Sequence, residues 1–124
     1  MKKRKILIVD DEKMITLTLV KLLNRAGYEA LAANDGREAI EMALKTDFDL
    51  IISDVRMPEL DGIRTLTEIR THSVASRKGV PIIFITGYAD EILEREAETL
   101  GCRDYIHKPF DLKFFLEKVK KALE

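Results

Sequence analysis

The chain has 124 residues, 46% of them hydrophobic and only 3 of them proline, so it is long and apolar enough to bury one core. Its 21 basic and 22 acidic residues nearly cancel, which leaves no overall field to attract nucleic acid or a membrane surface. The single cysteine, Cys102, excludes an intramolecular disulfide and a cysteine metal site. The sequence contains neither an apolar segment of membrane length nor a secretory leader. We therefore expect one soluble, cytoplasmic domain over residues 1–124.

Short β-branched apolar segments alternate with longer segments of helical period along the whole chain. A strand that is apolar at every position, such as 6–9, is typical of a sheet covered on both faces. The alternation predicts an α/β domain with a parallel sheet wrapped by helices. The expected elements in chain order are strand 6–9, helix 12–26, strand 28–33, a helix after the turn at 34–36, strand 48–53, a helix after Gly62, strand 80–85, helix 90–100, a short strand at 105–106, and a last helix capped by Asp111 with Leu112, Phe115, Leu116, Val119 and Leu123 inward.

Polar side chains stand at the carboxyl ends of four of these strands. Asp10 and Asp11 follow the first strand, Asp54 the third, Thr86 the fourth and Lys108 the fifth. Parallel strands joined by right-handed crossovers place these ends on one edge of the sheet, so we expect the five side chains to converge. Three clustered carboxylates repel one another unless a cation compensates, and a hard ion such as Mg²⁺ prefers carboxylate oxygens.

The charges of this cluster balance once a divalent ion is counted. Three carboxylates contribute −3, the ion +2 and Lys108 +1, which sum to zero. A phosphoryl group then meets no excess negative charge, and an aspartate carboxylate is an established phosphoryl nucleophile. The cluster therefore indicates phosphoryl transfer to an aspartate.

Four motifs at these positions resemble the response regulator receiver family of two-component signalling. The resemblance covers essentially the whole chain. It implies a single flavodoxin-like, CheY-like (βα)5 domain, whose doubly wound parallel sheet has the order 2-1-3-4-5 and is flanked by five helices. The motifs are Asp10-Asp11-Glu12, Asp54-Val55-Arg56-Met57-Pro58 with Asp61-Gly62, Thr86-Gly87, and Lys108-Pro109-Phe110.

The resemblance implies a metal site around the phosphoacceptor, which it assigns to Asp54. Asp11 and Asp54 are the expected direct ligands of Mg²⁺, or of Mn²⁺ in its place, and Asp10 is expected to hold metal-bound water. The backbone carbonyl of Arg56 is a further implied ligand.

The resemblance also implies a switch. Lys108 is expected to pair with the phosphoryl oxygens, and Thr86 to hydrogen-bond to them once Asp54 is modified. Tyr105 matches the aromatic position whose ring turns inward when Thr86 moves. The peptide bond between Lys108 and Pro109 is expected to be cis, and an X–Pro bond is where that isomer costs least.

By the same resemblance, the phosphodonor is a sensor histidine kinase or a phosphotransfer protein. The face formed by the fourth helix, the fifth strand and the fifth helix would then change shape for a downstream protein target or for an output domain absent from this chain. A phosphorylation-dependent dimer is left open, whereas direct binding to nucleic acid or to a membrane is not expected. The chain would be a signalling switch that catalyses only its own phosphorylation and dephosphorylation.

Two other functions fit parts of the pattern. A haloacid-dehalogenase-like phosphohydrolase also uses an aspartate, Mg²⁺ and a lysine, but it expects two aspartates one residue apart after the first strand, where Asp10 and Asp11 are adjacent. A flavodoxin-like electron carrier needs a Ser/Thr/Gly-rich phosphate loop, which is missing. Both are disfavoured.

Three further residues, which lie outside the cluster, could also have functional roles. His107 should point away from Lys108, because adjacent strand residues face opposite sides, and is expected to have a packing or surface role. Cys102 is expected to be a small buried apolar residue. Phe114 lies off the apolar stripe of the last helix, and partner contact and simple exposure stay equally open for it.

Overall fold

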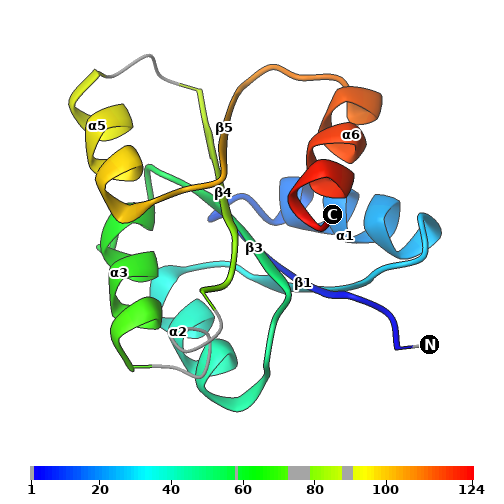
Figure 1. Cartoon of the computed structure of the whole chain (residues 1–124), viewed down its shortest axis with the longest axis horizontal. Helices are drawn as coiled ribbons and strands as arrows, with labels where there is room; N and C mark the ends of the chain where they lie inside the picture. The colour runs from blue at the N-terminus through cyan, green and yellow to red at the C-terminus, as the bar shows by residue number, and fades with distance from the viewer. Residues whose placement is uncertain (1, 58, 73–78, 88–90) are drawn as a thin grey trace.

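A computed structural model describes residues 2–57, 59–72, 79–87 and 91–124 (Figure 1). Pro58 and most of the expected loop at 71–79 lie outside these residues. The helices and strands are β1 (Lys5–Val9), α1 (Lys13–Arg25), β2 (Glu29–Ala33), α2 (Gly36–Lys45), β3 (Leu50–Asp54), α3 (Gly62–His72), β4 (Ile82–Thr86), α5 (Glu91–Leu100), β5 (Asp104–His107) and α6 (Leu112–Ala122).

Five parallel strands form one sheet in the order β2-β1-β3-β4-β5, which confirms the predicted flavodoxin-like topology. The chain moves outward from β1 to β2, crosses back to β3 and continues to β5 on the other side. The reversal of direction between β1 and β3 opens a crevice at their carboxyl ends. Asp10 and Asp54 stand at these two ends.

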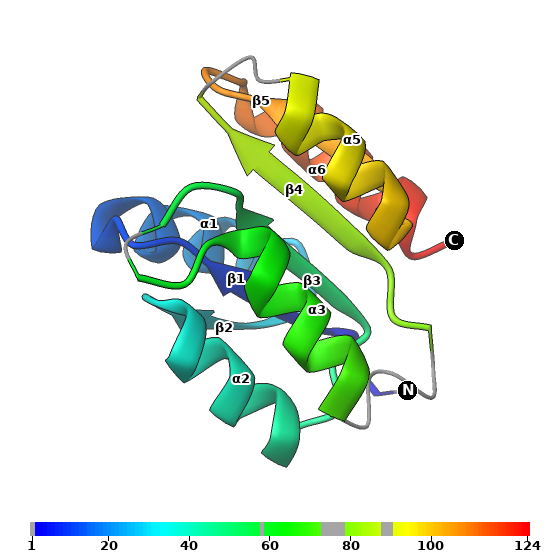
Figure 2. The same cartoon turned by 90° about the vertical axis from the view of Figure 1, so that its left-hand side faces the viewer.

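Helices cover both faces of the sheet (Figure 2), which explains why the central strands are apolar throughout. On one face, α1 and α6 bury Leu23 and Phe115 against Ile8 of β1. On the other face, α2, α3 and α5 bury residues such as Leu66 against Leu7. No helix in the described ranges has the length and apolar character needed to cross a bilayer.

The last helix differs from its predicted stripe at one position. Asp111 caps α6 as expected, because its side chain accepts a hydrogen bond from the backbone N–H of Phe114 at 2.7 Å. Phe115 and Val119 are buried, but Leu112 is 43% exposed. The prediction that Leu112 points inward is therefore wrong, because the buried stripe of α6 begins only at Phe115, one turn later.

The loop between β3 and α3 folds back tightly onto the end of β3. The backbone N–H of Gly62 donates to the carbonyl of Val55 at 2.8 Å. A Cβ atom on Gly62 would lie only 2.0 Å from the carbonyl oxygen of Asp54. Glycine is therefore required here by the close approach of two backbone segments.

We expect Gly62→Ala to destabilise the protein by about 1–3 kcal/mol, the usual cost of forcing a methyl group into a packed region. Urea denaturation of both proteins would measure this difference. Gly87→Ala is the matched control, because a Cβ at Gly87 meets its nearest atom, the Lys108 Cβ, only at 4.0 Å. Equal stabilities of the two variants would contradict the steric argument.

Candidate functional site

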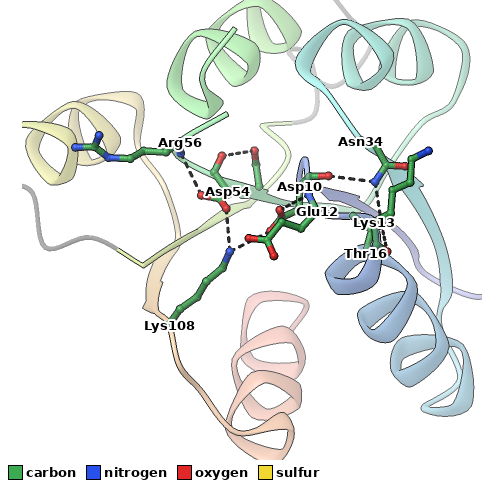
Figure 3. A network of polar contacts seen from close by, with 9 residues as sticks. Asp10, Glu12, Lys13, Thr16, Asn34, Asp54, Arg56 and Lys108 are labelled. Carbon is green, nitrogen blue, oxygen red and sulfur yellow. Dashed lines mark hydrogen bonds and ion pairs between the residues drawn. The ribbon is translucent and has the colours of Figure 1, made fainter. Parts of the chain in front are cut away.

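Side chains from three strand ends meet at one edge of the sheet (Figure 3). The Lys108 ammonium lies 2.9 Å from Oδ2 of Asp54 and 3.2 Å from Oδ2 of Asp10. Asp54 is 7% exposed and Asp10 is 3% exposed. One ammonium thus bridges two buried carboxylates that lie 44 residues apart in the sequence.

Backbone groups fix the second oxygen of each of these carboxylates. The N–H of Arg56 donates to Oδ1 of Asp54 at 3.1 Å, and the N–H of Glu12 donates to Oδ1 of Asp10 at 2.9 Å. The side chain of Arg56 itself extends away from Asp54 (Figure 3). Both carboxylates are therefore oriented by the loop that follows their strand.

Asn34 supports the cluster from outside, and the sequence reasoning missed it. Its amide nitrogen donates to the backbone carbonyl of Asp10 at 3.1 Å and to the Thr16 hydroxyl at 3.0 Å. It thereby ties the end of β1 to the first turn of α1. The available signal was its position, since Asn34 follows β2 directly at the same carboxyl edge.

The cluster opens into a cleft of about 880 Å³. Asp11, Asp54 and Lys108 line it together with Asp61 and Gly87. Because Asp11 is exposed and Asp54 reaches the cleft floor, a soluble ion or a phosphoryl group can approach both carboxylates from solvent. Ile92 and Leu93 of α5 form part of the opposite wall.

The electrostatics of the cluster show in two pKa values. The pKa of Asp10 is raised to about 6: burial is the largest cause and the charge of Asp54 adds to it, while the Glu12 hydrogen bond and Lys108 oppose the rise. Burial alone would lower the pKa of Lys108, but its hydrogen bonds and charge interactions with Asp54 and Asp10 outweigh this, and its pKa is raised. Lys108 therefore stays charged but does not neutralise the whole cluster.

The three carboxylates suit a hard cation. One oxygen each of Asp10, Asp11 and Asp54 can be chosen so that all lie within 4.8 Å of one another. Carboxylate oxygens this close together could share one divalent ion, either directly or through a bound water. The donors are oxygens only, and the negative charge in excess of Lys108 favours a divalent ion.

Thr86 ends β4, and Tyr105 lies within the neighbouring strand, β5. Thr86 is fully buried at the end of β4, and its backbone carbonyl accepts a hydrogen bond from the N–H of Lys108 at 2.7 Å. Tyr105 is half-buried and pairs with Phe84 of β4 in the sheet. The peptide bond between Lys108 and Pro109 is cis.

His107, Cys102 and Phe114 all lie outside the carboxylate cluster. His107 lies at the surface, where its Nε2 is 2.9 Å from Oε1 of Glu94. Cys102 is a half-buried free thiol whose pKa is raised by burial, which disfavours the reactive thiolate. Phe114 is 42% exposed, with the Lys118 ammonium 5.2 Å from its ring centre.

The raised pKa of Asp10 generates a stability prediction for the metal-free protein. A carboxyl whose folded pKa lies above the ordinary 3.8 costs no stability below that pH; its cost grows as the pH rises from 3.8 to about 6 and is constant above that. A difference of about two in pKa corresponds to at most about 3 kcal/mol. With EDTA present, Asp10→Asn should therefore be about 1–3 kcal/mol more stable than the wild type at about pH 8, and this advantage should vanish near pH 4.

Urea denaturation at both pH values measures this effect. Asp61→Asn is the control, because Asp61 lines the same cleft but its carboxyl serves the α3 N-terminus, where Oδ1 accepts from the Arg64 N–H at 2.8 Å. A wild type at least as stable as Asp10→Asn at the higher pH would contradict the assigned burial cost.

Comparisons with known proteins agree with this arrangement. The family model described as "Response regulator receiver domain" matches residues 6–120. The regulatory protein AtoC of Escherichia coli K12 is 38% identical over 97% of this chain, which spans only 25% of AtoC. The chemotaxis protein CheY4 of Vibrio cholerae has a TM-score of 0.90 at 34% identity, covering 98% of this chain and 100% of that one.

A further similar structure was solved with a bound ligand. It is the response regulator protein TrrA from Thermotoga maritima in complex with Mg²⁺-BeF, with a TM-score of 0.83, 33% identity, and coverage of 97% of this chain and 99% of that one. Because the family model spans nearly the whole length and the topology agrees, the chain belongs to the response regulator receiver domain family of two-component signalling.

Proposed function

We propose that Asp54 accepts a phosphoryl group from a sensor histidine kinase or a phosphotransfer protein and that the domain then switches a partner-binding face. The observation that carries this proposal is the bridging ammonium of Lys108, 2.9 Å from Asp54 at the floor of an open cleft. A carboxylate so placed can attack an incoming phosphorus atom while the ammonium offsets the charge on the phosphoryl oxygens.

The proposed reaction transfers the phosphoryl group from the donor's imidazole to Asp54. An Asp54 oxygen forms a bond to phosphorus as the bond between phosphorus and the donor's imidazole nitrogen breaks, and that nitrogen keeps the electron pair. The N–H of Arg56, 3.1 Å from Oδ1, keeps the carboxylate plane fixed during the attack. A water oxygen later forms a bond to phosphorus as the bond to the Asp54 oxygen breaks, which releases inorganic phosphate and restores the carboxylate. The domain thus acts as a switch that catalyses only its own modification and demodification.

Mg²⁺ is the proposed cofactor, and Mn²⁺ would satisfy the same oxygen ligands. Asp11, Asp54 and the backbone carbonyl of Arg56 would hold the ion, with Asp10 on a bound water. When bound, the ion supplies the positive charge that the transferring phosphoryl group needs. The convergence of the three carboxylates and the Mg²⁺-BeF complex of the similar protein TrrA support this assignment.

The proposed signal runs from Thr86 to Tyr105. A modified Asp54 carries three acceptor oxygens, and the Thr86 hydroxyl at the neighbouring strand end would donate to one of them. The Tyr105 ring would move into the space that Thr86 leaves. The α5–β5–α6 face, which includes the half-exposed Phe114, would then bind its partner in a new shape.

The partners of the domain are proposed from the family to which it belongs. The chain spans 25% of AtoC, so its output is either a separate protein target or a further domain of a longer protein. A dimer formed on phosphorylation would use the same face. We place the domain in the cytoplasm, with no direct contact to nucleic acid or membrane, because its charges nearly balance.

Acetyl phosphate with Mg²⁺ should add one phosphoryl group to the wild type, measured by intact-mass spectrometry. Asp54→Asn should show no addition, because the amide is not a phosphoryl nucleophile. Asp61→Asn, which changes another carboxylate in the cleft, should label like the wild type. Undiminished labelling of Asp54→Asn would sink the proposal.

Millimolar Mg²⁺ should raise the melting temperature of the wild type, with a stabilisation of about 1.4 kcal/mol when the ion is roughly tenfold above its Kd. Asp11→Asn should lose most of this stabilisation because a direct ligand is gone. Glu12→Gln, the adjacent acidic residue in the cleft, should keep it. Equal stabilisation of both variants would refute Asp11 as a ligand.

Thr86→Ala should still be phosphorylated but should transmit little of the change to Tyr105, because the methyl group cannot donate to the phosphate. Amide NMR spectra of the two phosphorylated proteins provide the measurement. Chemical-shift changes around Tyr105 that match those of the wild type would mean that the signal takes another route.

A further inference from the structure

The two ends of α5 are held in different ways. At the C-terminal end, the guanidinium of Arg70 donates through Nη1 to the carbonyl of Leu100 and through Nη2 to the carbonyl of Val80, the latter at 3.0 Å. Ala97, near the same end, is the one fully buried residue of α5, all of whose residues the structure describes. This end is therefore fixed both to α3 and to the beginning of β4.

The N-terminal half of α5 meets the sheet through an exposed contact. Nε2 of His107, on β5, lies 2.9 Å from Oε1 of Glu94, so the imidazole can donate a hydrogen bond to the carboxylate. In the same half, Ile92 is 70% exposed, and Leu93 is only partly buried against the core. Because Ile92 and Leu93 line the cleft, a movement of this half would reshape the wall that faces Asp54.

The Glu94–His107 contact adjoins the proposed switch residue. The rings of His107 and Tyr105 have their centres 5.2 Å apart, at an angle of 52°. A rotation of the Tyr105 ring therefore removes a neighbour of His107. Lys108, the residue after His107, forms ion pairs with both Asp10 and Asp54, as expected when Asp54 is unmodified. The Glu94–His107 contact is therefore seen in the unmodified arrangement of the site.

We infer that Glu94 and His107 are positioning residues that hold the N-terminal half of α5 against β5 in the unmodified protein, while the end near Leu100 acts as the pivot. The inference rests on the proposed function and adds a regulatory contact to it. Neither Glu94 nor His107 lines the cleft that holds Asp54, so each would act on the site through the position of α5.

This arrangement makes a thermodynamic prediction about the site. A contact made only in the resting state biases the domain against its modified state, and a ligand of the site must overcome that bias. The coupling is reciprocal, so removing the contact tightens binding at Asp54 by the same factor by which binding there weakens the contact. An exposed pair of this kind has a modest free energy, which corresponds to a gain of about 1.5- to 5-fold in affinity.

Beryllofluoride, which mimics an aspartyl phosphoryl group, provides the probe. Its apparent Kd at saturating Mg²⁺ would be measured by amide NMR for the wild type, Glu94→Ala, His107→Ala and the double variant, because alanine can neither donate nor accept across this contact. We expect each single variant to bind about 1.5- to 5-fold more tightly than the wild type and the double variant to gain no more than one single change. Glu96→Gln is the control, because Glu96 is exposed on the same helix and makes no ion pair within the described residues.

The melting temperatures of the ligand-free variants separate positioning from general stability. They should change little, because the contact is exposed, whereas the beryllofluoride affinity should shift. Unchanged or weaker affinity in the single variants, or the same gain in Glu96→Gln, would overturn the inference and leave the proposed function standing. Failure of the wild type itself to bind beryllofluoride with Mg²⁺ would overturn both.

Discussion

The structure depends on one electrostatic constraint, the clustering of three carboxylates beside a single ammonium. Lys108 contacts Asp54 and Asp10, but one positive charge does not balance three negative ones. Burial, with the charge of Asp54 added, raises the pKa of Asp10 to about 6. The excess negative charge in the cleft is of the kind that a divalent cation would balance. The fold supplies the stability that tolerates this repulsion, through two apolar layers on either side of the sheet.

The parallel topology brings these charges together without any local sequence proximity. Each functional group sits at or just beyond the carboxyl end of a strand, and β1 and β3 are neighbours where the direction of winding reverses. Backbone N–H groups in the following loops, those of Glu12 and Arg56, then fix the carboxylates. Position comes from the sheet and orientation from the loops, which explains why the residues form a site although 98 positions separate Asp10 from Lys108.

The α/β class was predictable from the sequence because apolar strands alternate with amphipathic helices, whereas the strand order was implied by the family resemblance. The convergence of Asp10, Asp54 and Lys108 followed from that topology. Other features depend on tertiary geometry. The exposure of Leu112 depends on which turn of α6 first reaches the core, and the contacts of Asn34 depend on how the end of β2 lies beside the end of β1. The pairing of Glu94 with His107 joins two elements whose spacing no local pattern encodes. The roles of the site residues remain predictions, because a role is defined by a reaction and not by a position.

The close backbone approach at Gly62 also determines which parts of the cleft can move. The N–H of Gly62 is bonded to the Val55 carbonyl, and there is no room for even a methyl group beside Asp54, so Gly62 is held against the end of β3. Ile92 and Leu93 of α5 also line the cleft, and there Ile92 is 70% exposed and Leu93 is only partly buried. A change in the shape of the cleft is therefore easier on the α5 side. In the proposed function, a phosphodonor would meet an acceptor that stays in place, and the signal that phosphorylation has occurred would leave the molecule through α5, on the other side of the cleft.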